Sequence, residues 1–351
     1  MQSQSKIARE EKDSMVGKAR YLQIAYSYYR RSLSCPYPPA HLDIESTSKC
    51  NLDCIMCPHS RLTRDKRNMD FSLFKKIIDE SSAFLNDIWL HLFGEPLLHP
   101  KIYEMVRYAR KSGIEVGLST NATLLNDGSI AEIMASGLDR ITISLDGATK
   151  ETYERTRRHS NYEHTLANIL SFLDAKKYPD RKPHVTIQLI RMKDTEKEIQ
   201  SFCESFRLLP VNEICVKDLD TWTGKIGSIN KLRVESFVPR STNRVPCGLL
   251  WYSMAIYADG RVVPCCRDFD AEYVLGDASS DELLSIWNGP RMKMIRQMHA
   301  ARDYARIGLC HGCLNWPHLN PVSEAQRRLY TLCSRARSRV SNRPLITHFR
   351  I

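Results

Sequence analysis

Six short apolar segments alternate with amphipathic segments between residues 41 and 218, and this alternation limits the fold more than any other feature. The expected strands span residues 41–47, 87–93, 114–120, 140–146, 184–190 and 213–218. The expected helices between them span residues 72–85, 100–113, 126–137 and 161–177. Such alternation builds a parallel sheet whose strands all end at one mouth. Because six units fall short of the eight in a closed barrel, the pattern predicts an α/β fold with a partial barrel.

The alternation fades after residue 222, and composition divides the rest of the chain. A turn-rich segment leads to a second cysteine-bearing region, where "ADG" predicts a β-hairpin over residues 251–266. The expected units are a basic helical segment at 1–40, the partial barrel at 41–222, a linker at 223–246, a small cysteine-rich extension at 247–318 and an Arg-rich tail at 319–351.

The net charge of +11 is concentrated at the two ends of the chain. Seven Lys and Arg against three acids give +4 before residue 41, and seven Arg against one Glu give +6 after residue 318. The body between them is almost neutral, at +1. The basic tail contains few aromatic residues, Tyr330 and Phe349, for stacking on bases. We therefore expect a solvated tail and no nucleic-acid partner.

The pattern of cysteines indicates metal binding. The start of the chain is polar, and no window is long and apolar enough for a membrane span, which favours a cytoplasmic location and no membrane partner. Thiols stay reduced in that compartment. Twelve cysteines, several of them two or three residues apart, therefore predict metal sites rather than disulfides.

The first cysteine group, Cys50, Cys54 and Cys57, has the spacing C-x3-C-x2-C and follows the first expected strand. Structural zinc sites and iron–sulfur clusters usually take four protein ligands, so three thiols leave one position open. The spacing alone permits two readings. One is a [4Fe–4S] cluster with a free iron, and the other is a zinc site completed by a distant residue.

The sequence around this group resembles the radical S-adenosylmethionine (SAM) superfamily. "CNLDCIMC" resembles its cluster loop, with Met56 where an aromatic residue is usual. "LFGEPLLHP" resembles its GGEP segment, with Phe93 in place of the first Gly. "STNATLL", "ISLDG" and "YERTRRHSNYEHTL" resemble three further segments in the same order. The resemblance implies a cluster on Cys50, Cys54 and Cys57 whose fourth iron binds SAM.

The same resemblance implies which side chains contact SAM. The GEP residues would line its methionine amino group, Ser144 its carboxylate or ribose, and Arg157 its carboxylate. The full expected set is Gly94, Glu95, Pro96, Thr120, Asn121, Ser144, Arg157 and Gln188. His59 and His91 also lie near this site, either as proton acceptors or, more commonly for such residues, as scaffold.

The second group resembles the SPASM/twitch extension found in part of the superfamily. "CGLLWYSMAIYADGRVVPC" and the later "CHGC" supply its cysteines. The resemblance implies one auxiliary [4Fe–4S] cluster, the second of the chain, on Cys247, Cys265, Cys310 and Cys313. A zinc knuckle from the same residues stays open. Cys266 is left over, as a packing residue, an alternative ligand or a hydrogen-atom donor.

A twitch layout with one auxiliary cluster resembles enzymes that oxidise an alcohol of a sugar or aminocyclitol. The expected activity is that of a radical SAM oxidoreductase, in which a 5′-deoxyadenosyl radical removes a hydrogen and the auxiliary cluster accepts an electron. An external donor such as flavodoxin or ferredoxin would supply the initiating electron. The alternatives are epimerisation with Cys266 as hydrogen donor, maturation of a ribosomal peptide, and a zinc module that binds nucleic acid. Because only 49 residues precede Cys50, we expect a small-molecule substrate.

Overall fold

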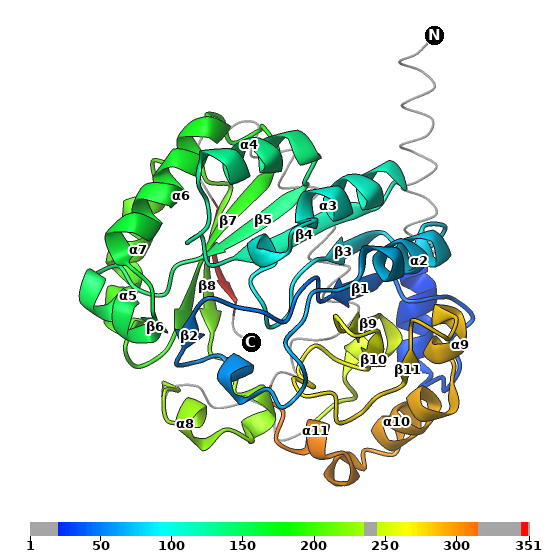
Figure 1. The fold of residues 1–351 in the computed structure, drawn as a ribbon. Helices are drawn as coiled ribbons and strands as arrows, with labels where there is room; N and C mark the ends of the chain where they lie inside the picture. Colours follow the sequence, from blue (N-terminus) through cyan, green and yellow to red (C-terminus); the bar gives the residue numbers. More distant parts are fainter. Residues whose placement is uncertain (1–19, 235–243, 315–344, 350–351) are drawn as a thin grey trace.

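The computed structural model describes residues 20–234, 244–314 and 345–349 (Figure 1). Six parallel strands form its central sheet in the order β1-β3-β4-β5-β7-β8, as the alternation predicted. They are β1 (His41–Ile44), β3 (Asp87–Trp89), β4 (Glu115–Thr120), β5 (Arg140–Ser144), β7 (His184–Arg191) and β8 (Glu213–Asp218). The sheet curves as a partial barrel.

The crossover helices follow one another around the outer face of this sheet (Figure 1). They are α2 (Phe71–Ser81), α3 (Ile102–Lys111), α4 (Asp127–Ser136), α5 (Lys150–Thr156), α6 (Tyr162–Lys176) and α7 (Ile199–Phe206). Four of them match the expected helices, whereas α5 and α7 are shorter than the periodic pattern could identify. Side chains cap the first turns of α2 and α4. Asp70 accepts a hydrogen bond from Ser72 N, and Asn126 accepts one from Ser129 N.

Each strand turns alternate side chains toward the helices and toward the inside of the barrel. In β1, Leu42 and Ile44 are fully buried in the main core, which also contains Ile141 and Ile143 of β5. The intervening residues His41 and Asp43 are polar and belong to the opposite face. The outer face of the sheet is therefore the hydrophobic core, and its inner face is free to carry chemistry.

The cysteine-rich extension continues the same sheet rather than packing as a separate layer. The expected hairpin is present as β9 (Ser253–Ile256) and β10 (Arg261–Val263), which pair antiparallel, and β10 pairs with β11 (Gly276–Asp277). The sequence did not predict that β9 pairs in parallel with β1. Because of this pairing the hairpin lies directly beside the loop that follows β1.

The remaining elements surround the extension and the far edge of the sheet. Of the expected helical segment at 1–40, residues 20–29 are helical, residues 30–40 are not, and residues 1–19 lie outside the described residues. The extension carries α9 (Leu283–Trp287), α10 (Pro290–Ala300) and α11 (Gly308–His311), and the expected linker contains α8 (Gly227–Asn230). Most of the Arg-rich tail lies outside the described residues, but β12 (Leu345–Phe349) pairs in parallel with β8. This part of the tail is thus a strand, and the side chains of Leu345 and Ile346 on it are exposed.

Among the described residues, no helix is both long and apolar enough to cross a membrane.

Candidate metal and SAM site

The first cysteine group lies on a loop that leaves the carboxyl end of β1 and folds back over the mouth of the barrel. Within it, β2 (Asp53–Cys54) pairs antiparallel with β6 (Arg157–Arg158), so that Cys54 and Arg157 are direct partners. Cys57 N donates to Cys54 O at 3.1 Å and closes the turn between these two cysteines. Two segments more than 100 residues apart in sequence therefore frame the same small space.

The three cysteine thiols of this loop interact electrostatically with one another. Burial raises the pKa of Cys54 to about 11, with Cys50 adding to the increase and Arg157 opposing it. Burial also raises the pKa of Cys57, and Cys54 and Cys50 raise it further. Binding to a metal centre deprotonates a coordinating thiol outright and would supply the positive charge that these buried sulfurs lack. The donor set therefore fits an iron–sulfur cluster.

No three His, Cys, Asp or Glu side chains in the described parts of the chain are arranged so that they could hold a single metal ion.

The GEP segment packs directly onto the residues that lead into this loop. Glu95 N donates to Lys49 O at 2.8 Å. A Cβ atom at Gly94 would lie only 2.0 Å from the carbonyl oxygen of Thr47, so any larger residue would push the segment away from the loop. Pro96 is buried and begins the short 3₁₀ turn η2 (Pro96–Leu98). Phe93, which stands where the superfamily usually has a glycine, immediately precedes Gly94 and this close contact.

The Glu95 carboxylate joins three expected SAM-binding residues in one network. It accepts hydrogen bonds from Thr120 Oγ1 at 2.7 Å and from Asn121 N at 2.8 Å. The Asn121 side chain in turn donates to Asn51 Oδ1 at 3.0 Å, within the cysteine loop. Burial raises the pKa of Glu95, and these donors oppose the increase. Glu95, Thr120 and Asn121 therefore lie together beside Cys50, while Asn51 was not anticipated.

Ser144 and Gln188 lie farther around the mouth. They are register partners on the adjacent strands β5 and β7, and Ser144 Oγ is 3.5 Å from Ser119 Oγ. Neither lies within the network around Glu95. Ser144 is the last residue of β5, whereas Gln188 lies in the middle of β7 rather than at its end as expected, because β7 continues to Arg191. Their contact with SAM stays a prediction.

Arg157 is held by a carboxylate that the sequence argument overlooked. Its Nε and Nη2 donate to Asp146 Oδ2 at 2.9 and 2.7 Å, and both residues are buried. The second oxygen of Asp146 accepts from Ile190 N at 2.6 Å. Asp146 therefore fixes the guanidinium beside the cysteine loop. Asp146 belongs to the "ISLDG" segment, two residues after Ser144, and this place in a matched segment was the signal that could have identified it.

The inner face of the barrel below this mouth is polar. The side chain of Asp43, 22% exposed, bonds to His41, whose Nε2 lies 3.2 Å from Asp43 Oδ1. The Nδ1 atom of His91 is buried and has no hydrogen-bond partner among the described residues. Burial lowers the pKa of His91 to about 4, and Asp43 and Lys217 exert opposite, smaller effects on it. His91 therefore carries a neutral imidazole within electrostatic range of Asp43 and Lys217.

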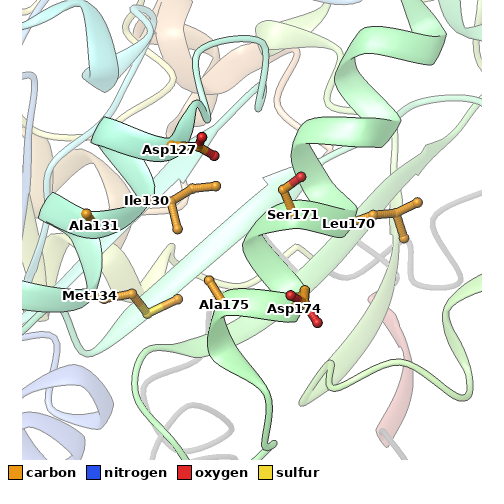
Figure 2. A pocket seen from close by; sticks show the side chains of 8 residues that line it. All are labelled: Asp127, Ile130, Ala131, Met134, Leu170, Ser171, Asp174 and Ala175. Carbon is orange, nitrogen blue, oxygen red and sulfur yellow. The ribbon is translucent and has the colours of Figure 1, made fainter.

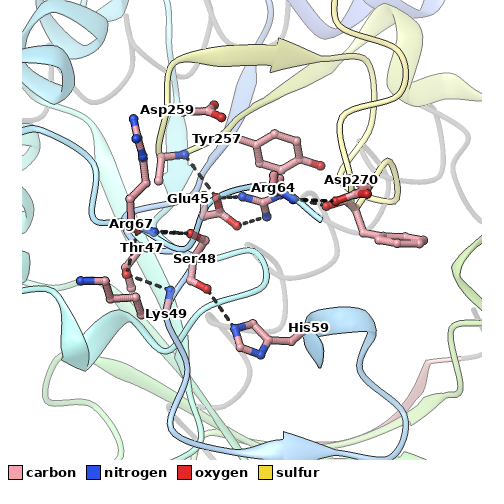
Figure 3. A network of polar contacts seen from close by, with 12 residues as sticks. Glu45, Thr47, Ser48, Lys49, His59, Arg64, Arg67, Tyr257, Asp259 and Asp270 are labelled. Carbon is pink, nitrogen blue, oxygen red and sulfur yellow. Dashed lines mark hydrogen bonds and ion pairs between the residues drawn. The ribbon is translucent and has the colours of Figure 1, made fainter. Parts of the chain in front are cut away.

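His59, in contrast, is part of the scaffold. Its Nε2 donates to the carbonyl of Ser48 at 2.9 Å and the side chain is buried (Figure 3). The same figure shows the ion pair of Glu45 and Arg64, with atoms 2.6 and 2.5 Å apart, and Arg64 also bonds to Asp270 and to the carbonyl of Phe269. These contacts fasten the loop after the first cysteines to the extension.

Three cysteines of the second group line a small cavity in the extension. Cys247, Cys265 and Cys310 line it together with apolar residues and two charged or polar side chains, Leu249, Leu250, Pro264, Arg267, Ile295, His299, Ile307 and Leu309. Burial raises the pKa of Cys247 to about 12, and the nearby Cys313 raises it further. Cys247, Cys265 and Cys310 therefore line one cavity, and Cys313 lies within electrostatic range of Cys247.

Two side chains at this cavity were missed by the sequence argument. His299 accepts from Cys247 N at 3.2 Å through Nδ1, and its Nε2 lies 3.3 Å from Cys310 Sγ. Arg267 is buried, and its backbone N donates to Cys265 Sγ at 3.4 Å. Both contact the candidate ligands without belonging to them, as residues that orient metal ligands do. A lone histidine on α10, 11 residues before Cys310, carried no recognisable spacing.

Cys266 lies on the side of the extension that faces the barrel. It packs with Phe93, Tyr257 and Phe269 rather than in the cavity of the second cysteine group. Cys265, burial and the Asp43 carboxylate together raise the pKa of Cys266. Cys266 is thus within electrostatic reach of a residue on the inner face of the barrel.

A second hollow lies on the outer layer, between α4 and α6, and Figure 2 shows the side chains that line it. Ile130, Met134 and Leu170 give it an apolar floor, and Asp127 and Asp174 lie at its margins. It belongs to the face of the helices rather than to the mouth of the barrel.

Comparison with known proteins decides the family. Residues 44–205 match the radical SAM superfamily, and residues 247–314 match an iron–sulfur cluster-binding domain of the SPASM type. This chain is a member of the radical SAM superfamily. Its radical SAM domain binds SAM and a [4Fe–4S] cluster, and its SPASM-type domain binds further iron–sulfur clusters. The resemblance drawn from the sequence is therefore confirmed.

Individual relatives agree with this assignment. A tungsten-containing aldehyde ferredoxin oxidoreductase cofactor-modifying protein of Pyrococcus furiosus is 27% identical over 300 residues, 73% of this chain and 83% of that protein. The fold is similar to that of BtrN in complex with AdoMet and 2-DOIA, with a TM-score of 0.53, 18% identity and coverage of 78% and 92%. It is also similar to Streptococcus suis SuiB bound to S-adenosylmethionine, with a TM-score of 0.59, 15% identity and coverage of 78% and 71%.

Proposed function

We propose that this radical SAM protein oxidises an alcohol of a small, hydroxylated molecule such as a sugar or aminocyclitol. Cys50, Cys54 and Cys57 would hold the cluster that binds SAM, and Cys247, Cys265, Cys310 and Cys313 would hold the auxiliary cluster. When bound, the first cluster and SAM supply a radical that takes a hydrogen atom from the carbinol carbon, and the auxiliary cluster supplies an acceptor for the remaining electron.

The polar inner face of the barrel carries this proposal. Oxidation of an alcohol to a ketone also releases the hydroxyl proton, which needs an acceptor within hydrogen-bond reach. Asp43 is held by His41 on one side and lies near His91 on the other. His91 is neutral and has an unpartnered Nδ1 among the described residues, so it can bind a hydroxyl while Asp43 takes the proton. Lys217 would bind a further substrate oxygen.

Two of the similarities described above support a substrate of this kind. BtrN, whose structure was determined with AdoMet and 2-DOIA, has a fold similar to that of this chain. The Pyrococcus furiosus relative is named for the modification of a cofactor, which also directs the search toward small molecules. The initiating electron would come from a flavodoxin or ferredoxin.

The first test is composition and SAM cleavage. Protein purified and reconstituted without oxygen should contain about eight iron and eight sulfide per chain, two cubes' worth. It should form 5′-deoxyadenosine from SAM when dithionite is added. Zinc in place of iron in protein purified under these conditions would exclude a radical mechanism.

The second test identifies the reaction. A panel of polyols and aminocyclitols deuterated at the carbinol carbons should transfer deuterium into 5′-deoxyadenosine and yield one ketone per 5′-deoxyadenosine. Failure of every member to transfer deuterium, in protein that cleaves SAM, would contradict the proposed substrate class.

Epimerisation is the second candidate, because Cys266 packs against Phe93 of the barrel and lies within electrostatic range of Asp43. Cys266→Ala separates the two reactions when the assay is run in deuterated water. A dehydrogenase still forms ketone, whereas an epimerase loses both product and solvent deuterium.

A further inference from the structure

One short segment, Asp220–Gly224, touches both cysteine sites. On the side of the first site, Trp222 Nε1 donates to the carbonyl of Met56 at 2.8 Å. Met56 stands between Cys54 and Cys57, so this bond reaches the centre of the cysteine loop. The Trp222 ring also packs against Phe93, with ring centroids 5.5 Å apart. Phe93 and Met56 are both positions where the sequence departs from the pattern of its superfamily.

On the side of the second site, the segment meets the "CHGC" turn. A Cβ atom at Gly312 would lie 2.1 Å from the carbonyl oxygen of Thr223, so the two backbones are in direct contact. Gly312 stands between Cys310 and Cys313. The backbone that follows Trp222 therefore forms one wall of the turn that carries two of the proposed auxiliary ligands.

A buried ion pair completes the link. Asp220 accepts from Trp222 N at 2.8 Å and from Arg267 Nε at 2.7 Å. Arg267 follows Cys265 and Cys266 in the chain and contacts the sulfur atoms of both. Both partners of the ion pair are about 8% exposed. The carboxylate thus ties the segment to the remaining cysteines of the extension.

The segment is rigid and strained. Trp222 and Thr223 have φ angles of 49° and 65°, in the left-handed region that residues other than glycine rarely adopt. Such conformations persist only where the surroundings over-determine them, and they cluster at functional sites. Here the indole bond to Met56, the contact with Gly312 and the carboxylate of Asp220 together hold the turn.

We propose that Asp220–Gly224 couples the two iron–sulfur sites, with Trp222 as the positioning residue that transmits the state of the auxiliary site to the SAM cluster loop. Filling the auxiliary site fixes the "CHGC" turn, and this turn fixes the strained segment. The segment then sets the Met56 carbonyl and with it the geometry of the first cluster. Because coupling is reciprocal, SAM binding at the first site also affects the auxiliary site. The inference rests on the ligand assignment above and does not depend on the substrate.

The experiment is a double-mutant cycle read by spectroscopy. Cys313→Ala removes an auxiliary ligand, and Trp222→Phe removes the indole N–H but keeps an aromatic ring. The midpoint potential and the EPR spectrum of the reduced first cluster are measured with SAM in wild type, in both variants and in their combination. Cys313→Ala should shift the potential and the spectrum of the first cluster when Trp222 is present, and the shift should be lost when residue 222 is Phe.

Trp287→Phe is the matched control, because Trp287 Nε1 also donates to a backbone carbonyl, that of Tyr37, at 2.8 Å. In that background the effect of Cys313→Ala should remain. Gly312→Ala, which alters no proposed ligand, should shift the first cluster in the same direction as Cys313→Ala. The proposal is overturned if Cys313→Ala leaves the first cluster unchanged, or if its effect is equal with Trp or Phe at residue 222. Neither the midpoint potential nor the EPR spectrum requires turnover. The result therefore stands even if the protein does not oxidise alcohols.

Discussion

At the scale of single residues, the site depends on polar groups that the fold places in apolar surroundings. Asp146 fixes Arg157 beside the cysteine loop, and Asp220 fixes Arg267 beside the extension's cysteines. Both are buried ion pairs, whose partners are costly to remove singly. Arg157 lies within electrostatic range of Cys54, and Arg267 of Cys266, two thiols whose pKa values are raised. The two sites thus use the same arrangement of carboxylate, guanidinium and sulfur.

The proposed proton acceptor can be tested at this scale. Asp43→Asn keeps the size of the side chain but removes its basicity, so kcat for the alcohol should fall by about 100-fold or more. Iron content and SAM cleavage without substrate should stay at wild-type levels. Asp79→Asn is the control, since its exposed carboxylate on α2 accepts from the Tyr108 hydroxyl at 2.6 Å. A kcat within a few-fold of wild type would assign the proton to another group.

His41 predicts a pH dependence of stability. Burial opposes its charged form, but the Asp87 and Asp43 carboxylates, with oxygen atoms 3.2 Å from the imidazole nitrogens, raise the pKa of His41 to about 10. Its charge therefore stabilises the fold fully below about pH 6.5, the ordinary pKa, and this contribution is lost as the pH rises through 10.

The measurement compares wild type with His41→Gln by urea unfolding of the metal-free protein. The difference in the free energy of unfolding should be largest near pH 6 and should shrink by at least about 1 kcal/mol toward pH 10, because one pKa unit corresponds to about 1.4 kcal/mol. A difference that does not vary with pH would mean that His41 is not charged in the folded protein.

At the scale of elements, close backbone contacts position the segments around the first cysteine loop. Gly94 touches Thr47 where the GEP segment crosses the loop. Gly94→Ala should lower the free energy of unfolding by about 1–3 kcal/mol, as overpacking does, and should weaken SAM binding. Gly227→Ala is the control, because a Cβ there meets nothing within 4 Å, and it should change stability by less than about 1 kcal/mol. Calorimetry and SAM titration measure both effects, and equal results for the two variants would contradict this contact.

Periodicity explains which elements the sequence could predict. The six barrel strands and four helices were identifiable because their apolar residues recur at the spacing of a strand or a helix. The pairing of β9 with β1 was not, because periodicity marks a strand but not its neighbour across 200 residues. Trp222 and His299 were missed for the same reason. Trp222 acts through its hydrogen bond to Met56, and His299 through its contacts with Cys247 N and Cys310 Sγ. Neither residue leaves a local pattern in the sequence.

Proximity among the expected site residues was predictable wherever a segment matched its superfamily as a unit, and their contact with SAM stays a prediction. Glu95, Thr120 and Asn121 lie beside Cys50 as their segments implied. The positions next to the matched residues were harder to assign, and both Asn51 and Asp146 have roles that emerged only from their hydrogen bonds. Asp146 shares its strand end with Ser144, yet only the fold brings Arg157 back to it.

At the scale of the whole molecule, barrel and extension behave as one unit. They share a sheet through β1 and β9, and one core contains Ile44 from the barrel together with Trp251 and Trp287 from the extension. Scanning calorimetry of the metal-free protein should therefore give a single unfolding transition, with equal calorimetric and van't Hoff enthalpies. Two resolved transitions would show that the extension unfolds independently despite the shared strand pairing.

The shared sheet also has a consequence for how the chain is made. While a ribosome synthesises it, β1 emerges about 200 residues before its partner β9, which at 5–20 residues per second is a delay of about 10–40 s. During that time one edge of the nascent barrel is an open row of backbone donors and acceptors, the kind of edge to which other chains attach. Slow synthesis of the second half would thus favour aggregation of the first, and the yield of folded protein would depend on how fast residues 253–256 arrive.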